Sequence, residues 1–325
     1  MNVTRFVPPA SHLAGAACLA LAIGTAAIAQ EKFPSKPIEV VTHAGVGGGT
    51  DITARMMMVQ APAAFGQELV IANKTGGAGA ASLAYAASRA KDGHTVLLIT
   101  QTHLLTILQG RGGGVKAEDI VAVARATEDP QVLMVGKGSP YKTAKEFVEA
   151  SKTKGLKYGT THVGGVDHLA VVGFAKSAGL QTPIVVPFRG GADIALNLVG
   201  GNLEASLLNY GEAEAQIKAG EVRPLLTLAS DRLPAIPDVP TAKEIGIDAN
   251  YSTTRGFVVL KGTPEDRTKT LEEGLVKAMS GKLYQDYLNS SGQAQKSVVG
   301  RQEWQAQIDE FFRTGQEALA SIGVR

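Results

Sequence analysis

The sequence contains a single cysteine, Cys18, among its 325 residues. Cys18 lies in an apolar run near the N-terminus, so the rest of the chain has no thiol. That part can form no disulfide, no cysteine nucleophile and no cysteine metal site. Aromatic residues make up only 5% of the chain, and no long run of like charges stands out at a formal net charge of +2. The composition gives no electrostatic footprint for nucleic acid.

Common catalytic and nucleotide-binding motifs are also missing. The chain has no G-x-S-x-G and no H-E-x-x-H. Its first glycine-rich loop, THAGVGGGTD at residues 42–51, lacks the lysine of a Walker A loop and does not complete the dinucleotide fingerprint G-x-G-x-x-G. The next strand ends at Ile71 and is followed by Ala72 and Asn73, not by the acid that holds a ribose. We expect no nucleotide, no cofactor and no enzymatic activity.

The N-terminal residues have the features of a secretory signal. Arg5 supplies the positive charge, residues 13–28 are uncharged and apolar, and Ala27-Ile28-Ala29 forms an A-x-A cleavage site. We predict that residues 1–29 are removed after Ala29 and that the remaining chain is periplasmic. Two alternatives stay open, a retained membrane anchor and lipidation of Cys18, although glycine stands where a lipoprotein signal has a larger aliphatic residue.

Strand-like and helix-like segments alternate along the rest of the chain. The strand candidates are residues 38–41, 68–71, 95–99, 131–135, 184–186, 205–208, 224–229 and 256–260. Helical patterns between them include residues 51–60, 80–90, 144–152 and 168–178. Alternation of this kind predicts parallel, doubly wound α/β sheets, and the spacing favours two smaller sheets over one. Near the C-terminus, Trp304, Ile308 and Phe311 lie on one apolar stripe of a helix that packs on the core.

Glycine-rich loops precede several of these helices. They lie at residues 42–51, 75–79, 159–165 and 189–191, and three of them also carry hydroxyl side chains. A strand, a glycine-rich turn and a helix start together present free N–H groups and the positive end of the helix dipole. A single such loop is explained by tight turn chemistry. Several loops from both halves of the chain favour a cleft that binds a small anion.

Histidines lie near these loops. His43, His103, His162 and His168 can form a hydrogen-bonding wall of a polar cleft. An alternative is a metal-dependent hydrolase that uses His162, Asp167 and His168, but the three residues do not make a complete set of well-spaced ligands. We expect no metal site.

Three stretches carry a resemblance to a known family. They are PSKPIEVVTHAGVGGGTDITAR, ELVIANKTGGAGAASLAYAASRAKDGHTVLL and a segment from VPFRGGADIALNLVGG to LPAIPDVPTAKEIG. Together they resemble, in the same order, the periplasmic receptors of tripartite tricarboxylate transporters, the Bug-type solute-binding proteins. The resemblance covers essentially the whole chain after the predicted leader.

The resemblance implies an α/β fold of the two-domain periplasmic-binding-protein type (type II). Each domain would be a mostly parallel sheet flanked by helices, with the ligand cleft between them. Residues 30–130 and 253–325 would form the first domain, and residues 131–252 the second. The protein would be a monomer that closes on a small carboxylate, such as a di- or tricarboxylate, and delivers it to the membrane subunits of the transporter. An alternative is a sensor that signals to a membrane kinase.

The resemblance also implies which residues meet the ligand. They are Gly47, Gly48, Gly49, Thr50, Asp51, Thr102, His103, Thr161, His162, Gly164, Gly190, Gly191 and Asn209. Arg189 and Arg255 are the arginines we consider as charge partners for the ligand. Two loops depart from the family pattern, at residues 43–46 and 100–103, and both departures place a histidine near the cleft. The identity of the ligand therefore cannot be copied from a relative.

Overall fold

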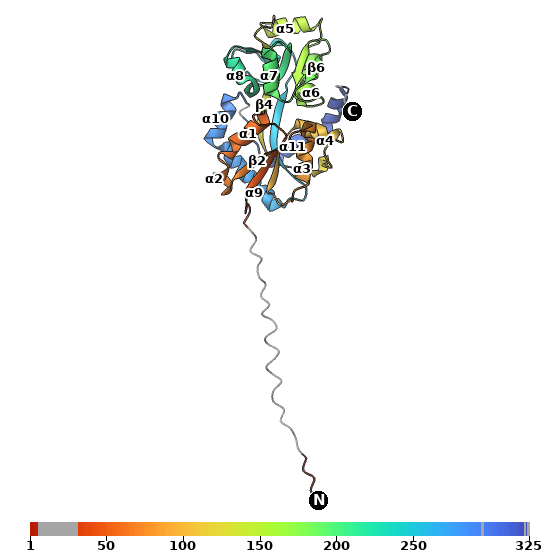
Figure 1. Cartoon of the computed structure of the whole chain (residues 1–325), viewed down its shortest axis with the longest axis vertical. Coiled ribbons are helices and arrows are strands. Elements are labelled where there is room, and N and C mark those ends of the chain that lie inside the picture. The colour runs from red at the N-terminus through yellow and green to blue at the C-terminus, as the bar shows by residue number, and fades with distance from the viewer. Residues whose placement is uncertain (6–31, 294–295, 322, 324–325) are drawn as a thin grey trace. The chain divides into compact units, whose positions relative to one another are not determined.

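The computed structural model describes residues 1–5, 32–293, 296–321 and 323 (Figure 1). The chain divides into residues 1–32 and residues 33–325, and the second unit is described here. Residues 6–29 of the predicted leader, Cys18 among them, and the cleavage site after Ala29 lie outside the described residues. None of the described helices is long and apolar enough to cross a membrane.

In the described residues, nine strands are joined by hydrogen bonds. They are β1 (Ile38–Thr42), β2 (Leu69–Asn73), β3 (Thr95–Thr100), β4 (Ile120–Gly136), β5 (Lys157–Thr160), β6 (Ile184–Pro187), β7 (Ala205–Asn209), β8 (Val222–Thr227) and β9 (Ser252–Leu260). Their order is β2-β1-β3-β9-β4-β7-β5-β6, and β8 pairs with β4 beside this path.

Helices connect and cover these strands. They are α1 (Gly49–Met58), α2 (Ala61–Phe65), α3 (Ala80–Ala87), α4 (Gln101–Leu108), α5 (Ala144–Ser151), α6 (Val166–Ser177), α7 (Gly191–Val199), α8 (Tyr210–Lys218), α9 (Glu265–Ser280), α10 (Lys282–Ser290) and α11 (Arg301–Ser321). Short 3-10 turns occur at Gly77–Gly79, Ala117–Asp119 and Lys243–Ile245.

Strand β4 belongs to two groups of strands. Its residues 120–130 pair with β9, and its residues 131–136 pair with β7 and β8, all antiparallel. We call β1, β2, β3 and β9 the first portion of the sheet, and β5, β6, β7 and β8 the second portion. Within them, β1 is parallel to β2 and β3, and β5 is parallel to β6 and β7. The two portions correspond to the two smaller sheets that were expected, and the long strand β4 belongs to both and joins them.

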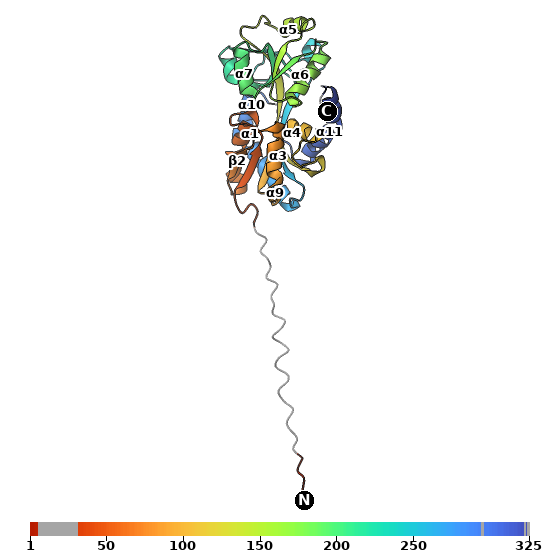
Figure 2. The same cartoon turned by 45° about the vertical axis from the view of Figure 1, so that its right-hand side comes forward.

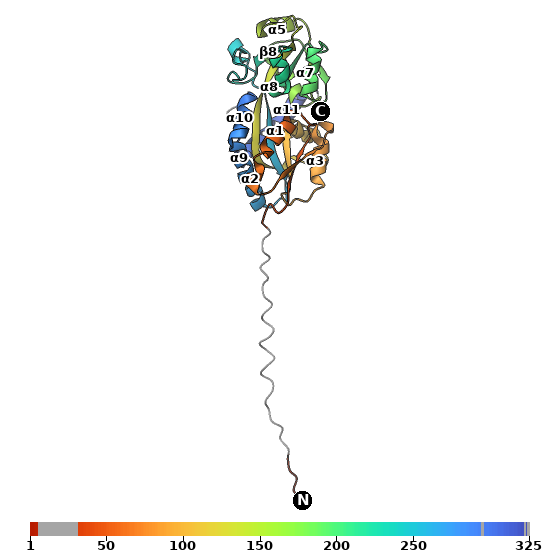
Figure 3. The ribbon, with the colours of Figure 1, turned by 60° about the vertical axis from the view of Figure 1, so that its left-hand side comes forward.

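Helices pack on both faces of each portion (Figures 2 and 3). In the first portion, α1, α2, α9 and α10 cover one face, whereas α3, α4 and α11 cover the other. The neighbouring residues Val40 and Val41 point to opposite faces and are both fully buried. In the second portion, α5 and α6 cover one face and α7 and α8 the other. A strand that is buried on both faces appears in the sequence as a continuous apolar run, and such runs allowed the positions of these strands to be predicted.

The prediction of a doubly wound α/β fold is confirmed, but two strand segments were missed. Strand β5 was read as part of a glycine loop, since its four residues include Gly159 and an exposed lysine, Lys157. The segment 120–130 of β4 contains Arg125, Glu128 and Asp129, charges that obscure the strand pattern. The apolar stripe of the last helix is also confirmed, because Trp304 and Ile308 are buried against β3 and β9.

Gly256 on β9 offers a test of this packing. A Cβ atom there would lie 2.4 Å from Cε2 of Trp304, a ring that is 2% exposed. We expect Gly256→Ala to lower the free energy of unfolding by about 1–3 kcal/mol, because the rigid ring and α11 must shift. Urea denaturation measures the change. The control Gly138→Ala places its Cβ in open space, and equal effects of the two substitutions would contradict the packing described here.

Candidate functional site

Five helices begin around one cavity of about 440 Å³. Helices α1, α4, α6, α7 and α8 follow β1, β3, β5, β6 and β7, and residues from the start of each helix line the cavity. The carboxyl ends of strands are the usual ligand-binding edge of such sheets. Helix starts also place unpaired N–H groups and the positive ends of dipoles there. The cavity is therefore suited to an anion.

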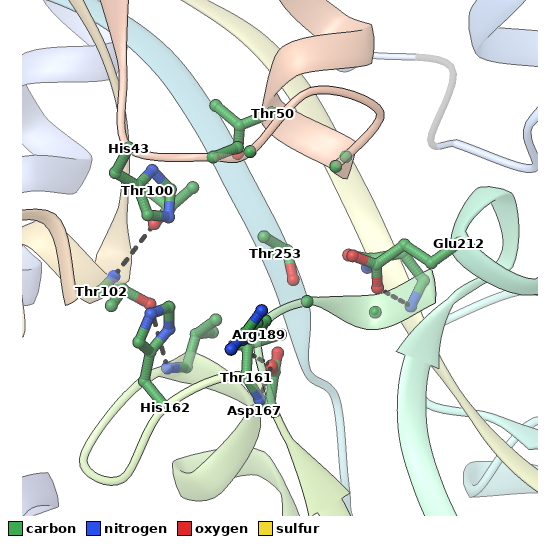
Figure 4. Close-up of a pocket in the computed structure, with 18 of the residues that line it drawn as sticks. His43, Thr50, Thr100, Thr102, Thr161, His162, Asp167, Arg189, Glu212 and Thr253 are labelled. Carbon is green, nitrogen blue, oxygen red and sulfur yellow. Dashed lines mark hydrogen bonds between the residues drawn. The ribbon is translucent and has the colours of Figure 1, made fainter. Parts of the chain in front are cut away.

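The cavity lies between loops of the first and second portions of the sheet (Figure 4). The lining residues are His43, Ala44, Gly45, Gly48, Gly49, Thr50, Thr75, Gly76, Thr100, Thr102, Thr161, His162, Val166, Asp167, Arg189, Gly190, Gly191, Asn209, Glu212, Thr253 and Arg255. Direct bonds cross between the two sets of loops: the Val166 N–H donates to Thr102 Oγ1 at 3.3 Å, and Gln109 Nε2 donates to the Gly164 carbonyl at 3.4 Å.

Most of the predicted binding residues meet at this cavity. Those in the lining are Gly48, Gly49, Thr50, Thr102, Thr161, His162, Gly190, Gly191 and Asn209, together with Arg189 and Arg255. Gly47, Asp51, His103 and Gly164 are not in the lining. A role of any of these residues in binding stays a prediction.

Asp51 holds the first glycine loop in place from behind. Its carboxylate accepts hydrogen bonds from the Gly47 N–H at 2.9 Å, from Arg55 at 2.8 and 3.0 Å, and from Asn73 Nδ2 at 2.8 Å. Burial acts to raise the pKa of Asp51, but these hydrogen bonds outweigh it and lower the pKa. The backbone around Gly48 and Gly49 is thus fixed at the cavity edge. Gly49 must lack a side chain, because a Cβ atom would lie 2.5 Å from Arg255 Nη2.

Three neutral imidazoles stand at one side of the cavity. His103 is fully buried, and its Nδ1 accepts the Thr100 N–H at 3.1 Å while its Nε2 lies 3.1 Å from Ser82 Oγ. The Ser82 hydroxyl donates to a carbonyl, so His103 Nε2 must carry the proton. Burial lowers the pKa of His103 to about 3. The ring of His43 lies 4.3 Å from that of His103 and 6.2 Å from that of His162.

Burial also lowers the pKa of both His43 and His162. Neighbouring histidines add to the effect at His43. The Nδ1 atoms of His43 and His162 are buried and have no hydrogen-bond partner among the described residues. Because buried polar atoms are normally paired, these two nitrogens are available to a ligand or to ordered water.

A buried ion pair forms the floor of the cavity. Arg255 Nη1 contacts Asp129 Oδ2 at 2.7 Å, and Arg255 Nη2 donates to Asn209 Oδ1 at 3.0 Å. Burial raises the pKa of Asp129 to about 6 even though Arg255 opposes the shift. Burial acts to lower the pKa of Arg255, but the attraction of Asp129 outweighs it. Arg189, in contrast, is exposed and makes no ion pair in the described part of the chain.

Sequence reasoning did not place Asp167 and Glu212 at an anion site. Asp167 accepts hydrogen bonds from the Thr161 N–H at 3.1 Å and from Gln131 Nε2 at 3.0 Å. Glu212 Oε2 accepts the Asn209 N–H at 3.2 Å and closes a capping box at the start of α8. The spacing Asn209-x-x-Glu212 after an apolar strand is the sequence signal that could have revealed Glu212.

The residues of the metal alternative are engaged in other contacts. His168 Nδ1 accepts the Gly164 N–H at 3.0 Å, and Asp167 is bonded as described above. Within the described residues, no group of three or more histidine, cysteine, aspartate or glutamate side chains is arranged to hold a metal ion.

The state of His103 leads to a pH prediction. His103 stays neutral in the fold down to about pH 3, whereas in the unfolded chain it takes up a proton near 6.5. Between these values the unfolded chain binds more protons, so the free energy of unfolding falls as the pH is lowered. His103→Gln keeps an acceptor for the Thr100 N–H and removes this titration. Urea denaturation at a series of pH values should show a shallower slope, by at most about 1.4 kcal/mol per pH unit.

Three other histidines also contribute to the pH dependence of the free energy of unfolding. Burial also lowers the pKa of His43, His162 and His168, so a part of the slope must remain in the variant. A slope equal to that of the unsubstituted protein would show that His103 is not the buried neutral group described here.

Comparison with known proteins gives a consistent result. The model of the TctC family, described as "Tripartite tricarboxylate transporter family receptor", matches residues 53–317 of this chain. BugT of Bordetella pertussis is 25% identical over 303 residues, with 90% of each chain covered. MatC of Rhodopseudomonas palustris, solved with bound malate, is 26% identical with a TM-score of 0.74, covering 89% of this chain and 98% of MatC.

A TctC solute-binding protein from Polaromonas, solved with no ligand, is 27% identical with a TM-score of 0.69. The match covers 89% of this chain and 99% of that protein. The family match covers most of the chain, and the fold is that of these periplasmic binding proteins. The cavity lies between loops of the two portions of the sheet. The chain belongs to the tripartite tricarboxylate transporter receptor family, whose members are periplasmic solute-binding proteins.

Proposed function

We propose that this protein captures a small organic acid, such as a di- or tricarboxylate, and delivers it to the membrane subunits of a tripartite tricarboxylate-type transporter. The observation that carries the proposal is the convergence of five helix starts on a cavity of about 440 Å³. That volume suits a small molecule. Bound malate in MatC, a relative, supports a carboxylate as the ligand.

The energy of binding would come from charge-assisted hydrogen bonds. The donors offered to a ligand include backbone N–H groups at the helix starts, the hydroxyls of Thr50 and Thr102, and the exposed guanidinium of Arg189. Each such bond to a charged group contributes about 1.5–3 kcal/mol. A handful of them therefore offsets the entropy lost on binding and reaches about −8 kcal/mol, a micromolar affinity.

Domain closure would accompany binding. In this proposal, residues 30–130 and 253–325 form one domain, residues 131–252 form the other, and both provide loops to the cavity. The bonds of β4 support the boundary, because its partner changes from β9 to β7 and β8 at residues 130 and 131. The bond between Thr102 and Val166 supports a closed arrangement. A ligand that contacts both sets of loops would favour this closed state over an open one.

Export and delivery complete the proposal. Cleavage after Ala29 would release a monomeric, non-enzymatic receptor into the periplasm. The family description, a receptor of a tripartite transporter, supports membrane transporter subunits as its partner.

Thermal unfolding with a panel of organic acids tests the proposal directly. A ligand that binds only the folded state raises the midpoint by mass action, which corresponds to about 2.7 kcal/mol at a hundredfold excess over Kd. We expect one or more acids to raise the midpoint, whereas their neutral amides do not. Adenine and nicotinamide nucleotides serve as controls, and a response to nucleotides alone would overturn the proposal.

The free charge of Arg189 gives a second test. Arg189→Gln should weaken binding of the acid found in the panel by about tenfold, because one charge-assisted bond is lost. Isothermal titration calorimetry measures the affinity. The control Arg232→Gln removes an exposed arginine that pairs with Glu244 and does not line the cavity. If both variants bind as tightly as the unsubstituted protein, Arg189 is not a ligand contact.

A further inference from the structure

The five helix starts around the cavity differ in charge. Helices α1, α6, α7 and α8 each carry an acid in the first turn, namely Asp51, Asp167, Asp193 and Glu212. The start of α4 has no acid, and it is capped by the neutral side chains of Thr100 and His103. An acid in the first turn offsets the positive end of a helix dipole. The positive potential of α4 therefore remains available to a ligand.

The two sides of the cavity differ in the same way. Figure 4 shows His43, Thr100, Thr102 and His162 on one side, with Glu212 on the opposite side. The first side carries imidazoles and hydroxyls, and the lining carboxylate whose charge acts on His162, Asp167, already accepts hydrogen bonds from Thr161 and Gln131. A ligand carboxylate is best placed there, beside the start of α4.

Glu212 is held in a fixed position on the other side. Its Oε1 lies 3.5 Å from the position of a Cβ atom on Gly49 and 2.5 Å from that of a Cβ atom on Gly191. The absence of a side chain at Gly191 makes room for the carboxyl group, whereas the distance from Gly49 is that of an ordinary contact. Its Oε2 accepts the Asn209 N–H, whereas Oε1 makes no hydrogen bond within the part of the chain that the structure describes.

No cation neutralises Glu212 in the described structure. The buried cation Arg255 uses Nη1 to contact Asp129 and Nη2 to donate to Asn209. Arg189 lines the cavity but forms no ion pair with Glu212. Burial, together with the negative charges of Asp167 and Asp129, raises the pKa of Glu212 to about 7, although Arg255 opposes this. A second carboxylate would be repelled at this side, whereas a cationic hydrogen-bond donor would be attracted.

We propose that Glu212 selects ligands that carry an ammonium group in addition to a carboxylate, so that the solute is an amino acid and not a simple di- or tricarboxylate. This inference rests on the proposed function and narrows its ligand class. The carboxylate lies at the side of His43, Thr102 and His162, and the ammonium donates to Glu212 Oε1. Glu212 thus acts as a specificity-determining residue, and Gly191 leaves the space it needs.

Matched ligand pairs provide the test, with isothermal titration calorimetry of the purified protein at neutral pH. The pairs are succinate and aspartate, glutarate and glutamate, and 3-phenylpropionate and phenylalanine, each differing by one ammonium group. In at least one pair we expect the amino acid to bind about tenfold or more tightly than its partner, the effect of one charge-assisted bond. Glu212→Gln keeps the acceptor for the Asn209 N–H and should remove this preference.

A control variant and the pH separate this role from a structural one. Glu214→Gln removes an exposed acid on the same helix that pairs with Lys218, and it should leave the preference unchanged. The amino-acid affinity of the unsubstituted protein should fall as the pH drops below about 7, where Glu212 takes up a proton, and Glu212→Gln should flatten this profile.

The two proposals fail in different ways. If simple acids bind as tightly as their amino partners, and Glu212→Gln changes neither, the selection by Glu212 is wrong while the carboxylate receptor stands. If no ligand of either kind binds, the proposed receptor function is contradicted and the inference falls with it. The comparison of ligand pairs needs no variant, so it decides the matter even if Glu212→Gln does not fold.

Discussion

The buried contact between Arg255 and Asp129 is the interaction on which the site depends. It joins β9 to β4 at the place where β4 leaves its partner β9 and continues beside β7. Asn209, the last residue of β7, accepts from Arg255 and donates to the Asp129 carbonyl at 2.8 Å, so three strands meet in one polar cluster. Such a cluster must be satisfied to be tolerated, because an unpaired buried charge is strongly destabilising. The cavity is built directly on it, and the strands cannot shift their register there without breaking it.

The rest of the cavity follows from the direction of the strands. Parallel strands of both portions end at the same cavity, so each following helix presents its first turn to it. At four of these helix starts, an acidic side chain in the first turn offsets the positive end of the helix dipole, whereas the start of α4 has no acid. The buried imidazole of His103 has a part in this, since a neutral cap does not offset the dipole. Selectivity in such a site comes from which helix starts the protein has already neutralised.

Some parts of the fold and of the site could be predicted from the sequence, whereas others could not. Fully buried strands such as β1 and β3 are continuous apolar runs, and the glycine loops after them marked the cavity edge. Strand β5 and the first part of β4 were missed, because Gly159 and the charges at Arg125 and Asp129 hide the pattern.

Among the residues that line the cavity, Thr50 and His162 were predicted from the loops that carry them. Asp51 and His103 lie close to the same loops but are not in the lining. Glu212 reaches the cavity from α8, a helix that no glycine-rich loop precedes. Side-chain direction is set by tertiary contacts, which a single sequence does not show.

The packing of Trp304 against Gly256 has a practical consequence. Trp304 is the only tryptophan of the chain, and the strand residue next to its glycine neighbour is Arg255 of the cavity floor. The indole therefore packs on β9 one residue away from Arg255, which lines the cavity. Its ring is 2% exposed, so we expect its fluorescence to depend on the packing of α11 against β9. For the receptor that we propose, Trp304 would thus serve as an intrinsic optical probe of β9, and a titration would need no added label.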